Sequence, residues 1–170
     1  HKHTMKQKQN NYAFIDSQNL NLGIRALGWR LDYKKFRRYL AEKYNVSYAY
    51  LFIGYLPGNQ PLYTNLQSQG YVLVFKPILE YPNGTVKGNV DAELVMYAML
   101  EYEHYDKAVV ISSDGDFHCL IDHLYQKDKL KAVISPHVKT CSVLLKKAAR
   151  EKIIFMDNLQ KKLEYTKNTA

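Results

Sequence analysis

The amino-acid sequence predicts an α/β fold, a three-layer α/β/α sandwich with a mostly parallel central sheet. Short apolar runs rich in β-branched and aromatic residues alternate along the chain with segments of helical periodicity, which is the order expected of a parallel sheet. Several of these runs end in acidic residues, and open parallel sheets bind their ligands at the carboxyl ends of the strands. The length of 170 residues suits one domain with a sizeable core.

The apolar runs are predicted as strands. They cover Tyr12–Ile15, Tyr48–Ile53, Tyr71–Phe75, Val109–Ile111, Leu130–Ile134 and Ile153–Phe155. Helical periodicity predicts helices between them, over Leu31–Tyr44 with Asp32 as N-cap, Pro61–Gln69, from about Asp91 to Tyr105, from Phe117 onward, and over Thr140–Arg150. The polar run Ser17–Asn21 is typical of a turn, and Lys76–Lys87 of a loop or small hairpin with Asn83-Gly84 as its turn.

The domain organisation follows from the two ends of the chain. Residues 1–10 form a polar lead whose start, His1 to Met5, resembles a cloning remnant before a native methionine. Residues 11–157 form a single domain, and residues 158–170 form a polar tail expected to fray from Leu159. No apolar run approaches the about 20 residues that span a bilayer, and no signal segment precedes the domain. We therefore expect a cytoplasmic protein with two free thiols, Cys119 and Cys141.

The charge balance points to an anionic partner. The formal net charge is +8 and the isoelectric point is about 9.3, and nucleic acid is the commonest partner of such a protein. Three groups of cations are candidates for a phosphate-binding track. They are Lys87, which follows a Pro- and Gly-containing loop, and the helical clusters Lys34-Lys35-Arg37-Arg38 and Lys146-Lys147-Arg150. An ordinary solvated helix face is the alternative for each cluster.

The acidic residues are the main candidates for chemistry. Asp16 ends the first strand, Asp114 and Asp116 follow the central strand in Ser112-Ser113-Asp114-Gly115-Asp116, and Asp91 lies in the first turn of a helix. Each could be a helix cap, yet the fold would bring all four together. Clustered carboxylates repel unless a cation or a shared proton relieves them. Hard oxygen ligands suit Mg²⁺ or Mn²⁺, and such ions promote phosphodiester hydrolysis.

Three segments in chain order carry a resemblance to a known family. They are Phe14-Ile15-Asp16-Ser17-Gln18-Asn19-Leu20, Lys87-Gly88-Asn89-Val90-Asp91 and Ser112-Ser113-Asp114-Gly115-Asp116-Phe117. Together they resemble the motifs of the NYN domain, the LabA-like branch of the PIN-like nucleases. The resemblance extends from Tyr12 to about Phe155.

The resemblance implies a PIN-like, Rossmann-like sandwich and metal-dependent nuclease activity, usually on RNA. It implies Asp16, Asp91, Asp114 and Asp116 as catalytic, metal-binding carboxylates, with Asn19 and Ser113 as polar support for the substrate; Lys87 is the cation placed beside them. The family usually has glycine where Ser113 stands, and small residues where Ser17 and Gln18 stand. These departures affect the neighbours of the carboxylates, and with them rate and substrate geometry.

Three functions are weighed. The first is a metal-dependent (endo)ribonuclease acting on single-stranded or structured RNA. The second is a catalytically weak PIN-like scaffold that binds RNA or a protein partner. The third is a phosphatase or Toprim-like phosphotransfer enzyme. A phosphatase of the haloacid dehalogenase type needs Asp-x-Asp after the first strand, and Asp16-Ser17-Gln18 lacks the second Asp, which counts against this function. The sequence is compatible with RNA or DNA as the substrate, with endonucleolytic or exonucleolytic cleavage, with one or more metal ions, and with a monomer or a homodimer.

Overall fold

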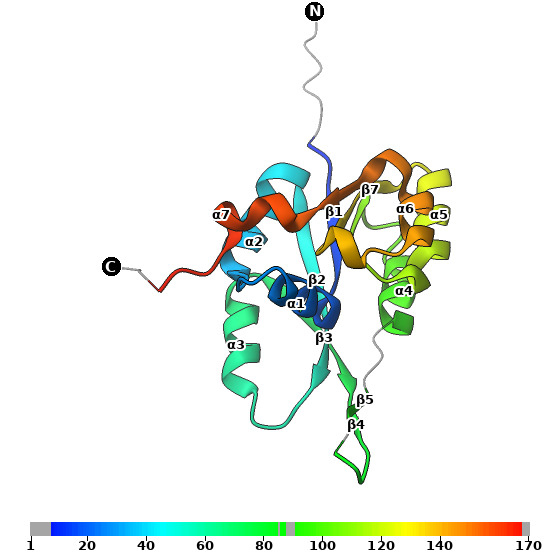
Figure 1. Ribbon diagram of the computed structural model, residues 1–170. Coiled ribbons are helices and arrows are strands. Elements are labelled where there is room, and N and C mark those ends of the chain that lie inside the picture. The colour runs from blue at the N-terminus through cyan, green and yellow to red at the C-terminus, as the bar shows by residue number, and fades with distance from the viewer. Residues whose placement is uncertain (1–7, 85, 88–90, 168–170) are drawn as a thin grey trace, which may run out of the picture.

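A single six-stranded sheet forms the centre of the molecule (Figure 1). The computed structural model describes residues 8–84, 86–87 and 91–167, so the start of the polar lead, the middle of the second motif at Gly88-Asn89-Val90 and the last three residues lie outside the described part. The strand order is β3-β2-β1-β6-β7-β8, and all five neighbouring pairs are parallel. The predicted three-layer α/β class with a parallel sheet is confirmed.

Each predicted strand is present, with bounds that differ from the prediction by a few residues at most. They are β1 (Asn11–Asp16), β2 (Val46–Tyr55), β3 (Tyr71–Pro77), β6 (Ala108–Ile111), β7 (Leu130–Ser135) and β8 (Ile153–Phe155). The predicted hairpin is also present, as the antiparallel pair β4 (Leu79–Glu80) and β5 (Val86–Lys87). It extends from the carboxyl end of the sheet (Figure 1).

The strand order creates a reversal point between β1 and β6. The chain moves outward from β1 through β2 to β3, and then returns to build β6, β7 and β8 on the other side of β1. At such a point the connections after the two neighbouring strands diverge to opposite faces, which opens a crevice at the carboxyl edge. Ile15 pairs with Ile111 there, so the residues that follow each of them become neighbours.

Helices cover both faces of the sheet. The α-helices are α1 (Ser17–Ala26), α2 (Tyr33–Tyr44), α3 (Gln60–Ser68), α4 (Asp91–Leu100), α5 (His118–Gln126), α6 (Val143–Ala149) and α7 (Gln160–Leu163). Short 3₁₀ turns are η1 (Gly115–Phe117), η2 (Val138–Thr140), η3 (Arg150–Lys152) and η4 (Met156–Leu159). Apolar residues of α1, α2, α3 and α7 share one core with the sheet, and those of α4, α5 and α6 share the other.

Two successive buried residues of β1 show how the strands contribute to both layers. Successive residues of a strand point to opposite faces, and in β1 Ile15 belongs to the core under α1 and α2 while Phe14 belongs to the core under α4 and α5. Phe14 stacks on Tyr50 of β2 with ring centroids 5.6 Å apart. Side chains of β1 are thus buried on both faces of the sheet, and β1 carries the first of the acidic residues.

The prediction of a turn over Ser17–Asn21 is wrong, because these residues open helix α1. The polar composition of this segment masks its helical periodicity, since Leu20 and Ile24 are four residues apart and are both buried on one face of the helix. Helix α4 is shorter than predicted and ends at Leu100. There the chain turns back so that the buried Tyr105 donates a hydrogen bond of 2.7 Å to the Ala98 carbonyl, near the helix end where carbonyls need a partner.

The prediction that the chain frays from Leu159 is also wrong. Residues Gln160–Leu163 form helix α7, and Leu163 is fully buried in the core under α2. The Asp32 amide donates to the Leu163 carbonyl at 2.8 Å, and the Tyr165 amide donates to the Arg30 carbonyl at 2.8 Å. The burial of Leu163 and these two backbone hydrogen bonds together hold the polar segment against the domain.

Two smaller expectations can be compared with the structure. Both cysteines are free, Cys119 exposed and Cys141 buried, as predicted. None of the helices in the described ranges has the length and apolar character needed to cross a membrane.

Candidate metal centre

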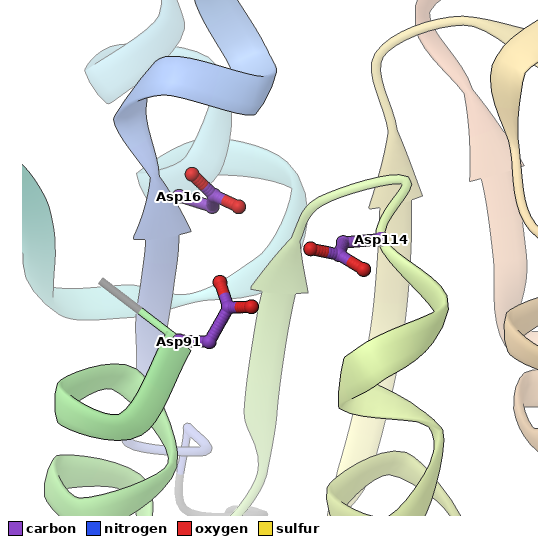
Figure 2. Close-up of side chains that lie close together, drawn as sticks. All are labelled: Asp16, Asp91 and Asp114. Atoms are coloured by element: carbon purple, nitrogen blue, oxygen red, sulfur yellow. The ribbon is translucent and has the colours of Figure 1, made fainter. Parts of the chain in front are cut away.

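Three carboxylates meet at the reversal point of the sheet. Asp16 ends β1, Asp114 follows β6, and Asp91 begins α4. Figure 2 shows their side chains pointing toward one another from these three elements. Each residue offers one carboxylate oxygen, and these oxygens all lie within 4.8 Å of one another. The convergence predicted from the sequence therefore holds for three of the four acidic residues.

Asp16 is held in place by hydrogen bonds to both of its oxygens. Its Oδ1 accepts from the Asn19 amide at 3.2 Å, which makes it the N-cap of α1. Its Oδ2 accepts from the Ser112 hydroxyl at 3.2 Å. The side chain is only 4% exposed. Capping and membership of the cluster, which are alternatives in the sequence, thus coexist in one carboxylate.

Ser112 connects two of the three carboxylates and is a residue that sequence reasoning missed. Its fully buried hydroxyl donates to Asp16 and accepts from the Asp114 amide at 3.1 Å. The Asp114 side chain in turn caps the next turn, because its Oδ1 accepts from the Asp116 amide at 2.9 Å. The available signal was the placement of a serine directly at the end of a strand that pairs with β1.

Asn19 and Ser113 fasten the two connections to each other. The Asn19 side-chain oxygen accepts from the Ser113 amide at 2.8 Å. The Ser113 hydroxyl is hydrogen-bonded to the Ser135 hydroxyl at 2.7 Å, beneath the site at the end of β7. Both side chains therefore make contacts within the protein, and these contacts position the loop that carries Asp114.

Gly115 makes room for the next helix. A Cβ built on this residue would lie 2.9 Å from Ser142 Cβ and closer still to the Ser142 hydroxyl. Ser142 caps α6 by accepting from the Leu144 amide at 3.2 Å, and its own amide donates to the Ser113 carbonyl at 3.1 Å. The glycine of the motif thus serves close packing between η1 and the start of α6.

The electrostatics of the cluster favour protonation in the absence of a cation. The pKa of Asp91 is raised to about 6 by burial, by the negative charges of Asp114, Asp16 and Asp116, and by a hydrogen bond with the Asp114 side chain. Burial also raises the pKa of Asp16, with the charge of Asp114 adding to it, although the hydrogen bonds from Asn19 and Ser112 oppose the rise. A divalent cation would remove this repulsion, and carboxylate oxygens are the donors that Mg²⁺ and Mn²⁺ prefer. The donor set therefore fits such an ion.

The remaining predicted site residues lie outside the three-carboxylate cluster. Asp116 is exposed in η1, next to the cluster but not among the three, and its role stays a prediction. The backbone of Lys87 pairs with Leu79 in β5, and nothing is described of its side chain. Glu93, two residues after Asp91 in α4, forms an ion pair with Lys76, whose Nζ lies 3.4 Å from Glu93 Oε2.

Several cations of the two helical clusters contact other parts of the protein, and a shared track stays a prediction. On α2, Lys35 donates to the Glu164 carbonyl at 2.9 Å and Arg37 donates to the carbonyls of Gly70, Val46 and Ser47. Beyond α6, Arg150 lies over the ring of Tyr125, 4.5 Å from its centroid, near the end of α5 that is farthest from Asp114. Several of these cations are therefore committed to the fold, and Lys34 and Arg38 remain exposed.

A comparison with family models places this site in a known group. The NYN domain matches the chain over residues 12–157. The chain belongs to the NYN domain family. This match includes all three clustered carboxylates and agrees with the resemblance found in the motifs. NYN domains form a branch of the PIN-like nuclease superfamily, and the six-stranded parallel sheet flanked by helices is a PIN-like fold.

The chain is also similar to individual proteins. It is 30% identical over 132 residues to the low amplitude and bright protein LabA of Synechococcus elongatus, a match that covers 72% of this chain and 71% of LabA. Its fold matches the crystal structure of a protein of unknown function from Vibrio parahaemolyticus with a TM-score of 0.74 and 22% identity. That match covers 95% of this chain and all of the other.

Proposed function

We propose that this NYN domain is a metal-dependent ribonuclease that uses Mg²⁺ or Mn²⁺ to hydrolyse phosphodiester bonds in RNA. The observation that carries the proposal is the meeting of Asp16, Asp91 and Asp114, whose oxygens lie within 4.8 Å of one another at the carboxyl edge of a parallel sheet. Membership of a family within the PIN-like nucleases supports the same reading.

Some residues of the site would bind the metal ion, and others position the residues that bind it. Asp16, Asp91 and Asp114 would hold the ion, and Asp116 would stand at the rim of the same site. A divalent ion bound there lowers the pKa of water and stabilises the charge that develops on phosphate oxygens. Ser112 orients Asp16 and the Asp114 backbone together, and Asn19 keeps the two connections at a fixed separation through Ser113.

The substrate must be held by cations, because the carboxylates themselves repel a polyanion. The net charge of +8 favours nucleic acid as the partner. Lys87 is proposed as one contact, since its backbone position in β5 precedes Asp91 in the chain by four residues. Affinity for single-stranded RNA should then fall with salt, with a log–log slope of about −0.7 per phosphate contacted.

The decisive assay for the proposal is cleavage of labelled single-stranded RNA in Mn²⁺, in Mg²⁺ and in EDTA. We expect cleavage with either ion, none in EDTA and none by Asp114→Asn, which keeps the shape of the side chain while removing its charge. RNA that is bound but left intact with both ions would instead favour the catalytically weak scaffold. Equal rates for wild type and Asp114→Asn would refute the site assignment. A cytoplasmic location and a homodimer stay predictions.

A further inference from the structure

A second feature of the carboxyl edge is a pocket of about 800 Å³ beside the metal centre. It is lined by α1, the start of α2, the end of β2 and α3, and it is called the α1–α3 pocket below. Its volume lies within the range of about 300–1,000 Å³ that small-molecule sites occupy. Every residue that lines it belongs to the described part of the chain.

Two elements bring the pocket next to the carboxylates. Ser17 and Gln18, which line it, follow Asp16 directly in the chain. Phe52, which also lines it, is the residue of β2 that pairs with Asp16. A polymer whose phosphate lay at the three carboxylates would therefore place an adjoining unit at the mouth of this pocket.

The walls suit a flat heterocycle. Ile53, Leu56 and Leu62, which are half-buried or exposed, supply apolar surface from β2, the turn after it and α3. Side-chain amides stand among them, and one of these, Gln69, has a buried oxygen that finds no hydrogen-bond partner in the described chain. A buried acceptor without a donor is unfavourable. A ring N–H or exocyclic amine of a nucleobase would supply that donor while its faces rested on the apolar wall.

The rest of the lining suits a phosphate. Arg25, Arg30 and Lys34 all line the pocket and are all exposed. None of the three takes part in an ion pair with another described residue. The one carboxylate among the lining residues, Asp32, accepts from the Lys35 amide at 3.1 Å as the N-cap of α2. Uncompensated cations beside an apolar, amide-lined cavity match a nucleotide better than a neutral metabolite or a free anion.

We propose that the α1–α3 pocket binds one nucleotide of the nucleic-acid substrate, next to the phosphodiester bond that is cleaved. The inference rests on the proposed function for the position of that bond, and on the pocket itself for the chemistry of the ligand. Arg25 and Lys34 hold the phosphate, and Gln69 receives a hydrogen bond from the base. Binding at this pocket requires no metal ion.

The test is calorimetric titration of the wild-type protein with AMP, GMP, CMP and UMP, each alone, in EDTA. We expect at least one of them to bind, and Arg25→Gln to weaken that affinity about tenfold, as loss of a charge-assisted hydrogen bond does. Arg38→Gln is the matched control, because it removes the same charge from an exposed residue of α2 that does not line the pocket. Gln69→Met should reduce the preference among the four bases.

The outcomes separate this inference from the proposed function. Binding of a mononucleotide that depends on Arg25 but not on Arg38 supports the pocket, even if RNA is never cleaved. Cleavage of RNA by a protein that binds no mononucleotide at concentrations up to about 10 mM overturns the pocket and leaves the nuclease proposal standing. Equal losses of mononucleotide affinity in Arg25→Gln and Arg38→Gln would mean that binding depends only on the overall charge of the protein. That result would also overturn the pocket.

Discussion

Replacement of Asp91 by asparagine should make the metal-free protein more stable and the metal-treated protein less stable than wild type. The reason is that Asp91 is one of three carboxylates whose oxygens lie within 4.8 Å of one another, and its raised pKa of about 6 reports their mutual repulsion together with burial. The change to Asn keeps the side-chain shape and removes two of the three repulsive pairs.

The magnitude follows from the geometry. Two unit charges at 4.8 Å repel by about 3.5 kcal/mol at an effective dielectric constant of about 20 and by about 0.9 kcal/mol in water. Asp91 is only half-buried, so screening brings each pair toward the lower figure. Two pairs then give about 2 kcal/mol, which raises the melting temperature by about 4–8 °C for a chain of this size.

The assay is thermal unfolding in EDTA and in Mn²⁺ at two pH values. Below about pH 4, the Asp91 carboxyl is protonated in the folded and in the unfolded protein. Between about pH 4 and 6 it keeps its proton in the folded protein and loses it in the unfolded one. The contribution of Asp91 to the free energy of unfolding in EDTA therefore falls as the pH rises through this range. The gain from Asp91→Asn should therefore be small at pH 4.5 and full at pH 7.5. Mn²⁺ at 100 times its dissociation constant should stabilise wild type by about 2.7 kcal/mol and the variant far less.

Glu42→Gln is the control, since it makes the same chemical change on the exposed face of α2 and should stay within about 0.5 kcal/mol of wild type. The reasoning would be refuted by an Asp91→Asn protein that is less stable than wild type in EDTA at pH 7.5. It would also be refuted by an equal response of both proteins to Mn²⁺.

Three further results are expected. Ser112→Ala should weaken Mn²⁺ affinity about 10- to 100-fold, as loss of a group that orients ligands does. Ser113→Ala is the control and should leave that affinity within a few fold, because the Ser113 hydroxyl bonds Ser135 and not a carboxylate. Equal effects of the two changes in a calorimetric titration would contradict this role of Ser112. Gly115→Ala should lower the free energy of unfolding by about 1–3 kcal/mol because its Cβ would collide with Ser142, and an unchanged urea midpoint would disprove the packing role. Mn²⁺ should bind more tightly as pH rises toward about 6 and then level off, because the proton on Asp91 must leave first; affinity that is constant from pH 5 to 7 would exclude this.

The sheet could be predicted from the sequence because its central strands β1, β6 and β7 are buried on both faces. A run such as Val109–Ile111 has no polar alternation to confuse with a surface strand, and the structure places it at the centre of the sheet. The meeting of Asp16 and Asp114 was also predictable, since both follow strands at a carboxyl edge. What the sequence could not supply was that β1 and β6 are neighbours, which makes that meeting direct.

The errors have a common cause, which is that tertiary contacts outweigh local polarity. Helix α1 was taken for a turn because Leu20 and Ile24 are the only two buried apolar residues along it. The tail was taken for a frayed end, although Leu163 fills a place in the core. Ser112 was overlooked because its importance depends on two hydrogen bonds to partners in different segments.

The central claim, that Asp16, Asp91 and Asp114 together hold a divalent cation, is tested most directly by anomalous diffraction from crystals grown with Mn²⁺. We expect an anomalous peak within about 2.0–2.3 Å of an oxygen from each of the three carboxylates, and the loss of that peak in crystals of Asp114→Asn. An empty site at saturating Mn²⁺, or a peak that persists unchanged in Asp114→Asn, would contradict it.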